Sequence, residues 1–155
     1  MVITNIQRSI DTENEVANKD QANKLKLTEE ECQQSTGYTF LKYQRETTIR
    51  DYFKCLAKKH SDTAHYEQIG NSYQGRELFL IKIGNSSAHG PRKPAVWIDG
   101  GIHAREWISP ATVAYIITEL LNNADRHADI LNEFDFYVMP LINPDGYEYT
   151  HTNDR

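Results

Sequence analysis

Two side chains of the kinds that bind metals stand three positions apart in the middle of the chain. His103 and Glu106 are separated only by Ala104 and Arg105. On a turn that enters a helix, residues i and i+3 lie on one face, so an imidazole and a carboxylate at this spacing can bind one ion. This pair of donors suits a borderline metal such as zinc. A catalytic zinc site needs three protein ligands and an open position for water, so the pair would supply two of the three.

The same spacing also has an interpretation without chemistry. Glutamate is favoured at a helix start by the helix dipole, and a histidine beside it can be an ordinary surface residue. The flanking sequence favours a site. The short apolar run Ala95–Ile98 is typical of a buried strand, and Asp99, Gly100 and Gly101 break it before a helix begins. In open α/β sheets, ligands bind at the mouth formed where such strands end.

The segment from Gly100 to Thr112 reads Gly-Gly-Ile-His-Ala-Arg-Glu-Trp-Ile-Ser-Pro-Ala-Thr. It resembles the first zinc-binding motif of the secreted metallocarboxypeptidases, the carboxypeptidase A/B family. The resemblance implies that His103 and Glu106 are ligands of one Zn²⁺ ion. It also implies that Arg105 lies in the substrate cleft and contacts a peptide carbonyl. The implied activity is zinc-dependent removal of single residues from the C-termini of peptides and proteins.

Two further segments resemble the same family. Ile69–Leu78 is similar to the first hairpin of its catalytic domain. The block Asn143–Tyr147 (Asn-Pro-Asp-Gly-Tyr), with Thr-His-Thr-Asn-Asp-Arg shortly after it, is similar to the family's next motif. In that motif the arginine that matches Arg155 contributes to substrate subsites. The resemblance therefore implies two substrate-binding residues, Arg105 and Arg155.

The family mechanism needs groups that these 155 residues do not hold. The resemblance implies a general-base glutamate, an arginine that stabilises the oxyanion and a second zinc-binding histidine, and no position matches any of them. No catalytic residue is therefore assigned within this chain. His127 and His151 lie in no matching motif and are interpreted as surface residues. We expect a truncated product that is inactive as written and whose sheet has an exposed edge.

The first 36 residues differ in character from the rest. After a few apolar residues near the N-terminus, the chain becomes polar as far as Thr36. This segment resembles the tail of a procarboxypeptidase activation segment followed by a linker, which implies a zymogen. Lys24 and Lys26 would then be candidate sites for an activating trypsin-like protease. We expect two regions: residues 1–36 as activation segment and linker, and residues 37–155 as the N-terminal part of the catalytic domain.

The hydrophobic pattern predicts the elements that hold the site. An amphipathic stripe predicts a helix over 45–59, with Thr48 and Asp51 as a possible capping pair. Strands are expected at 66–72 and 77–83 as a hairpin, and at 134–142 as a strand buried on both faces. Ser109 and Pro110 would start a second amphipathic helix, and Asn143-Pro-Asp-Gly predicts a turn. The expected fold class is α/β: half of a mixed twisted sheet flanked by helices.

Composition narrows the class of protein. The net charge of −5 without a basic block argues against nucleic-acid binding, and no apolar run could span a bilayer. No signal peptide is visible, so an extracellular location is implied only by the resemblance. Cys55 falls in the first predicted helix and Cys32 in the polar linker. Two free thiols are favoured, although a bridge between them is compatible with the sequence.

Two other functions remain open from the sequence. A related zinc deacylase, acting on N-acyl amino acids, also uses a His-x-x-Glu pair on a similar sheet. Alternatively, the chain is a non-catalytic binding or regulatory product. Arg105, Glu106 and Trp107 together with the block at Asn143 favour the peptidase. The residue preference at the substrate C-terminus is not encoded in this chain.

Overall fold

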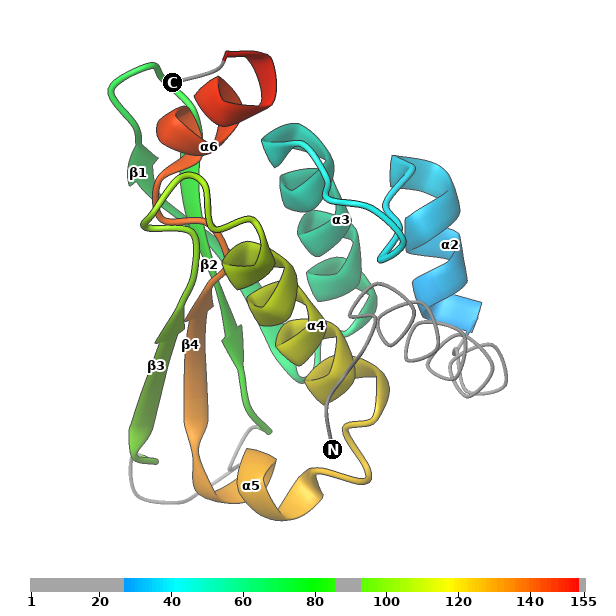
Figure 1. Ribbon diagram of the computed structural model, residues 1–155. Coiled ribbons are helices and arrows are strands. Elements are labelled where there is room, and N and C mark those ends of the chain that lie inside the picture. The colour runs from blue at the N-terminus through cyan, green and yellow to red at the C-terminus, as the bar shows by residue number, and fades with distance from the viewer. Residues whose placement is uncertain (1–26, 86–92, 154–155) are drawn as a thin grey trace, which may run out of the picture.

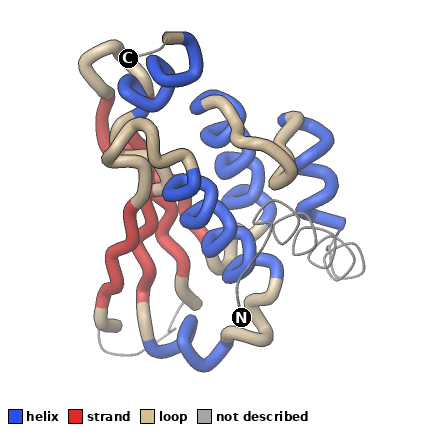
Figure 2. The backbone as a smooth tube through the Cα atoms, viewed as in Figure 1, coloured by secondary structure: helices blue, strands red, loops and turns tan. Residues whose placement is uncertain are grey.

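The computed structural model describes residues 27–85 and 93–153. Four strands form one sheet, and the helices α3 and α4 pack side by side on one of its faces (Figures 1 and 2). Helix α2 lies outside α3, while α5 and α6 lie at opposite ends of the sheet (Figure 1). None of the helices in the described part is both long enough and apolar enough to cross a membrane.

The sheet is mixed, as expected. It consists of β1 (Ala64–Asn71), β2 (Glu77–Ile83), β3 (Ala95–Asp99) and β4 (Asp135–Met139), in the spatial order β1-β2-β4-β3. The hairpin β1–β2 and the pair β2–β4 are antiparallel, and β3 is parallel to β4. The last residues of β3 and β4 are paired with each other, so both strands have their C-terminal ends at the same end of the sheet. The α/β fold class is confirmed.

Strand β3 forms an exposed edge of the described sheet. This strand is at the edge of the described sheet, and Trp97 at its centre is 54% exposed. Strand β4 is shorter than predicted, and only its last two residues are buried. The prediction that the whole strand is buried on both faces is wrong, because its first three residues are only partly buried; the described helices lie on one face of the sheet (Figure 2).

Both long helices follow the predicted apolar stripes, but their starts differ. Helix α3 spans Glu46–Lys59, so Thr48 lies inside its first turn and the predicted Thr48–Asp51 capping pair is wrong. Helix α4 spans Ile108–Asn122 and starts before Ser109. Instead of capping the helix, the Ser109 hydroxyl accepts a hydrogen bond from the Gly101 amide at 3.1 Å. The core lies between these helices and the sheet; its largest fully buried members include Tyr52, Phe53, Leu56, Ile81, Ile83, Ile117, Leu121 and Tyr147.

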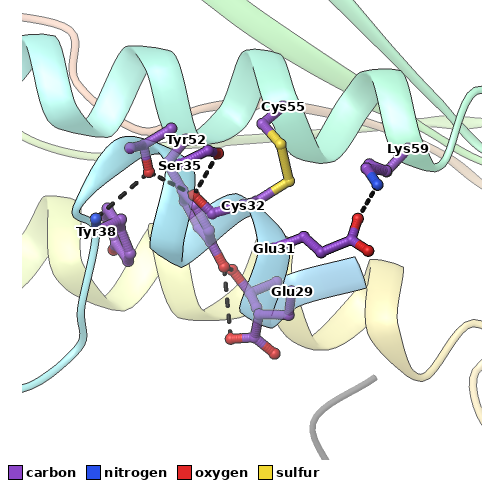
Figure 3. Close-up of a disulfide and its surroundings, with 10 residues drawn as sticks. Glu29, Glu31, Cys32, Ser35, Tyr38, Tyr52, Cys55 and Lys59 are labelled. Atoms are coloured by element: carbon purple, nitrogen blue, oxygen red, sulfur yellow. Dashed lines mark hydrogen bonds and ion pairs between the residues drawn. A yellow bond between two sulfur atoms is a disulfide. The ribbon is translucent and has the colours of Figure 1, made fainter. Parts of the chain in front are cut away.

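A disulfide joins two helices near the N-terminal end of the described chain (Figure 3). Residues Leu27–Thr36 form helix α2, and Cys32 on α2 is bonded to Cys55 on α3. The prediction of two free thiols is wrong, and Cys32 lies on a packed helix. Helix packing brings the two Cα atoms to 5.7 Å, which is within the range of a disulfide. An ion pair between Glu31 and Lys59 lies beside the disulfide (Figure 3).

Helix α2 also buries a carboxylate. Glu29 is 2% exposed, and it accepts hydrogen bonds from Gln33 at 3.0 Å and from Asn122 on α4. The Tyr52 hydroxyl donates to it at 3.5 Å. Burial raises the pKa of Glu29 to about 7, since the ionised form loses water that these few partners do not replace.

The two helices that follow α4 complete the described chain. Residues Ala128–Glu133 form the short helix α5. Residues Pro144–Thr152 form α6, so the prediction of a turn at Asn143-Pro-Asp-Gly is wrong. The side chain of Asn143 accepts a hydrogen bond from the Gly146 amide at 3.0 Å, and Pro144 occupies the first turn. Asparagine followed by proline is also favourable at the start of a helix, and here these two residues start α6.

Candidate metal centre

The candidate site lies on the loop between β3 and α4, here called the candidate metal loop, at the end of the sheet where β3 and β4 have their C-terminal residues. Gly101 turns this loop with a φ of +69°, which other residue types rarely adopt. A Cβ atom at this position would stand 2.6 Å from Cδ1 of Leu141, so the turn also lacks room for a side chain. The amides of Ile142 and Asn143 donate to the carbonyls of Gly100 and Gly101, at 2.9 and 3.2 Å. The loop therefore leaves β3 in a fixed direction.

His103 and Glu106 meet on this loop. Nδ1 of His103 lies 3.2 Å from Oε1 of Glu106, and the two side chains are 71% and 60% exposed. Two atoms that bind one tetrahedral zinc at ordinary distances of ~2.1 Å are separated by about 3.4 Å. The observed separation is that of a hydrogen bond between the two side chains and is also close to this value, so the pair is compatible with two ligands of one ion. The exposure of both side chains leaves room for a further ligand.

Of the other candidate residues, one shares this loop and the rest lie outside the described part. Arg105 is exposed on the same loop, and Arg155 lies outside the described residues, as do Lys24 and Lys26. Within residues 27–85 and 93–153, no group of three or more His, Cys, Asp and Glu side chains is placed to hold a metal. The described part thus offers only the pair His103 and Glu106 as candidate ligands for zinc.

The two remaining candidate histidines have structural surroundings. His127 starts α5, at the opposite end of the sheet from α6, and its Nε2 lies 3.1 Å from Oε1 of Glu119. His151 stacks on the indole of Trp107 with 4.1 Å between ring centroids, and its buried Nε2 has no hydrogen-bond partner. Both residues are half-buried, so they are less exposed than the interpretation as surface residues implies.

Helix α6 carries supporting residues that sequence reasoning missed. The Asn143 side-chain amide donates to the Ile102 carbonyl at 3.2 Å, and the Trp107 indole N–H donates to the Thr150 hydroxyl at 2.9 Å. Ile102 and Trp107 are the immediate neighbours of His103 and Glu106 in the chain. The signal available in the sequence was the Asn-Pro pair, which also predicts a helix start and so would have placed Asn143 and Thr150 on one element.

Helix α6 is itself anchored to the β1–β2 hairpin. The carboxylate of Asp145 accepts hydrogen bonds from the Ser72 hydroxyl at 2.7 Å, the Gln74 amide at 3.0 Å and the Arg76 guanidinium at 2.7 Å. Partial burial alone would raise the pKa of Asp145, but these three donors outweigh it and hold the pKa below its ordinary value. The hairpin therefore fixes the N-terminal turn of α6.

A second anchor joins α6 to the start of α3. The Glu148 carboxylate accepts from the Glu46 amide at 2.8 Å and forms an ion pair with Arg45. Burial opposes ionisation of Glu148, and the Arg45 and Glu46 contacts outweigh it, so the pKa of Glu148 is lowered. Helix α6 thus links the hairpin, α3 and the candidate metal loop.

Comparison with known proteins gives consistent results. A family profile described as zinc carboxypeptidase matches residues 49–155. The carboxypeptidase B of Astacus astacus is 48% identical over 113 residues, which cover 73% of this chain and 36% of that protein. The structure of thrombin-activatable fibrinolysis inhibitor aligns with a TM-score of 0.65 at 34% identity, covering 74% of this chain and 29% of that one.

One solved structure covers almost the whole chain. The carboxypeptidase A of Helicoverpa armigera aligns with a TM-score of 0.71 at 24% identity over 99% of this chain and 36% of that one. At this identity the alignment concerns the fold alone. The chain spans about a third of the length of these relatives.

Proposed function

The chain belongs to the zinc carboxypeptidase family, and from this premise we propose that His103 and Glu106 are two ligands of a single catalytic Zn²⁺ ion. The observation that carries the proposal is the 3.2 Å separation of Nδ1 and Oε1, on a loop fixed between β3 and α4. When bound, zinc would acidify a water molecule and polarise a peptide carbonyl. The residues of this chain contribute by binding the ion and orienting the substrate.

The proposed substrates are the C-termini of peptides and proteins, from which one residue is removed by hydrolysis. Arg105, exposed on the metal loop, would contact a peptide carbonyl, and Arg155 would contribute to substrate subsites. The relatives named carboxypeptidase B support a peptidase over a deacylase. The sequence holds two of the family's three zinc ligands and no general base, so hydrolysis would depend on residues beyond these 155.

We further propose that the protein is a secreted zymogen. The Cys32–Cys55 disulfide supports this location, because disulfides persist in oxidising compartments. A trypsin-like protease would activate the protein by cutting after Lys24 or Lys26, ahead of α2. Trypsin treatment followed by mass measurement tests this step, and a first cut inside residues 37–153 would argue against it.

Zinc binding by the chain itself tests the metal site. Purified chain is titrated with zinc against a chromophoric chelator, together with His103→Ala and Glu106→Gln. The exposed residues His65 and Glu133 provide matched controls as His65→Ala and Glu133→Gln. One ion per chain is expected, with strongly reduced affinity in the two site variants only. Equal affinity of the wild type and both site variants would refute the assignment of the ligands.

A further inference from the structure

The backbone on either side of His103 is held by hydrogen bonds. The Ile102 carbonyl accepts from Nδ2 of Asn143 at 3.2 Å, and the His103 carbonyl accepts from the Glu106 amide at 3.1 Å. The first of these donors comes from the start of α6, 41 positions away in the chain. The peptide group that precedes His103 is therefore fixed by a different element from the one that carries it.

Asn143 performs two tasks at once. Its Oδ1 accepts from the Gly146 amide at 3.0 Å and so caps α6, while its Nδ2 faces the loop. These two partners define which side-chain atom is oxygen and which is nitrogen. A Cβ atom on Gly146 would stand 2.6 Å from Nδ2 of Asn143 and 3.0 Å from Cβ of Ala104. The close approach of α6 to the loop therefore depends on glycine at this position.

A second contact reaches the loop beside Glu106. The Trp107 indole N–H donates to the Thr150 hydroxyl at 2.9 Å, and its ring stacks on His151. Oγ1 of Thr150 lies 2.8 Å from the Tyr147 carbonyl oxygen and 3.2 Å from the Ala104 carbonyl oxygen, so its hydroxyl can donate to either. Thr150 therefore fixes the residue that follows Glu106 and lies against the loop between the two candidate ligands.

We propose that Asn143 and Thr150 are positioning residues for the metal centre, Asn143 acting on His103 through the Ile102 carbonyl and Thr150 acting on Glu106 through Trp107. This inference rests on the proposed function, since it takes His103 and Glu106 as ligands. Positioning matters here because both ligand side chains are exposed and little packing restrains them. Partners of this kind around a metal ligand commonly change metal affinity by about 10–100-fold.

One substitution separates positioning from helix capping. In Asn143→Asp the remaining oxygen still accepts from Gly146, and aspartate caps helices as well as asparagine does. The donor to Ile102 is replaced by an oxygen, which repels the carbonyl. The added negative charge lies near the metal and would by itself strengthen cation binding. A loss of affinity would therefore come from the lost donor and from neither capping nor charge.

The first test compares the wild type with Asn143→Asp and with Asn71→Asp, an exposed control that gains the same charge at the end of β1. Zinc affinity is measured by chelator competition, and the amide and imidazole NMR signals of His103 are recorded without metal. We expect about tenfold or greater loss of zinc affinity and shifted His103 signals in Asn143→Asp only.

The outcomes distinguish this inference from the function on which it rests. If the wild type binds no zinc, the proposed function fails, and the His103 signals of the metal-free chain still decide whether Asn143 positions this residue. If the wild type binds zinc and Asn143→Asp binds it within twofold, the role of Asn143 is refuted while the ligands stand. Unchanged His103 signals in Asn143→Asp would also refute it.

The role of Thr150 is tested in the same way with Thr150→Val and Thr150→Ser. Serine retains the hydroxyl that accepts from Trp107, so it should restore the affinity that valine loses. Thr152→Val, on the exposed end of α6, serves as the control. Equal zinc affinities for the valine and serine variants, at equal unfolding midpoints, would remove Thr150 from the inference.

Discussion

Reduction of the Cys32–Cys55 disulfide is the perturbation whose effect can be worked out most directly. The bond joins α2 to α3 across a sequence separation of 23 residues. Closing a loop of this length in the unfolded chain lowers its entropy by an amount that corresponds to ~3.5 kcal/mol at 25 °C. The folded chain already holds both residues in packed helices, so most of the effect falls on the unfolded state.

The assay is urea unfolding of the oxidised and the reduced chain, both refolded under otherwise identical conditions. With a urea dependence of about 1.5–2 kcal/mol per molar, the midpoint should fall by roughly 2 M on reduction. The double variant Cys32→Ala/Cys55→Ala should unfold at one midpoint whether or not reductant is present. Coincident midpoints for oxidised and reduced wild type, or two free thiols by mass in the chain purified without reductant, would refute the reasoning.

Three further predictions concern stability. Because Glu29 keeps its proton up to about pH 7 when folded and loses it near 4.5 when unfolded, the free energy of unfolding should decrease by about 3 kcal/mol between these pH values. Glu29→Gln should flatten this part of the pH profile of urea midpoints. Gly101→Ala should lower the free energy of unfolding by at least ~1 kcal/mol more than Gly75→Ala does. Both glycines have positive φ, but only at Gly101 would the added Cβ atom meet Leu141. Equal urea midpoints for the two variants would contradict this. Asp145→Asn should be less stable than the wild type at pH 7, because the fold stabilises the ionised Asp145 carboxylate. The deficit should shrink as the pH falls through the acidic range and this carboxylate is protonated.

The elements that the sequence predicted well are those whose signal is local. The stripes of α3 and α4 and the hairpin β1–β2 needed only neighbouring residues, and these elements lie close to where they were expected. Helix starts were less predictable. Ser109 has the right side chain for a cap, but its hydroxyl serves the Gly101 turn instead. Local preference alone cannot decide between two such partners.

The candidate site shows the same division. The types and spacing of His103 and Glu106 were visible in the sequence, and the structure adds the distance between Nδ1 of His103 and Oε1 of Glu106. Contacts that depend on packing were not visible. Asn143 reaches Ile102 across 41 positions and Trp107 reaches Thr150 across 43. The bond from Cys32 to Cys55 similarly required α2 to form and pack on α3.

The strand order has a consequence for how the chain folds during synthesis. In the described sheet β4 is the last strand to be made, yet it lies between β2 and β3. In the described sheet β3 pairs with β4 alone, so β3 cannot pair before residues 135–139 leave the ribosome. The two strands of the β1–β2 hairpin pair across a short turn and can form early, whereas the β3–β4 pair must first close a long loop. Pulse-labelled hydrogen exchange during refolding should therefore protect β1 and β2 before β3, and the loop between β3 and α4 would gain its hydrogen bonds to Asn143 and Thr150 only after β4 and α6 have formed.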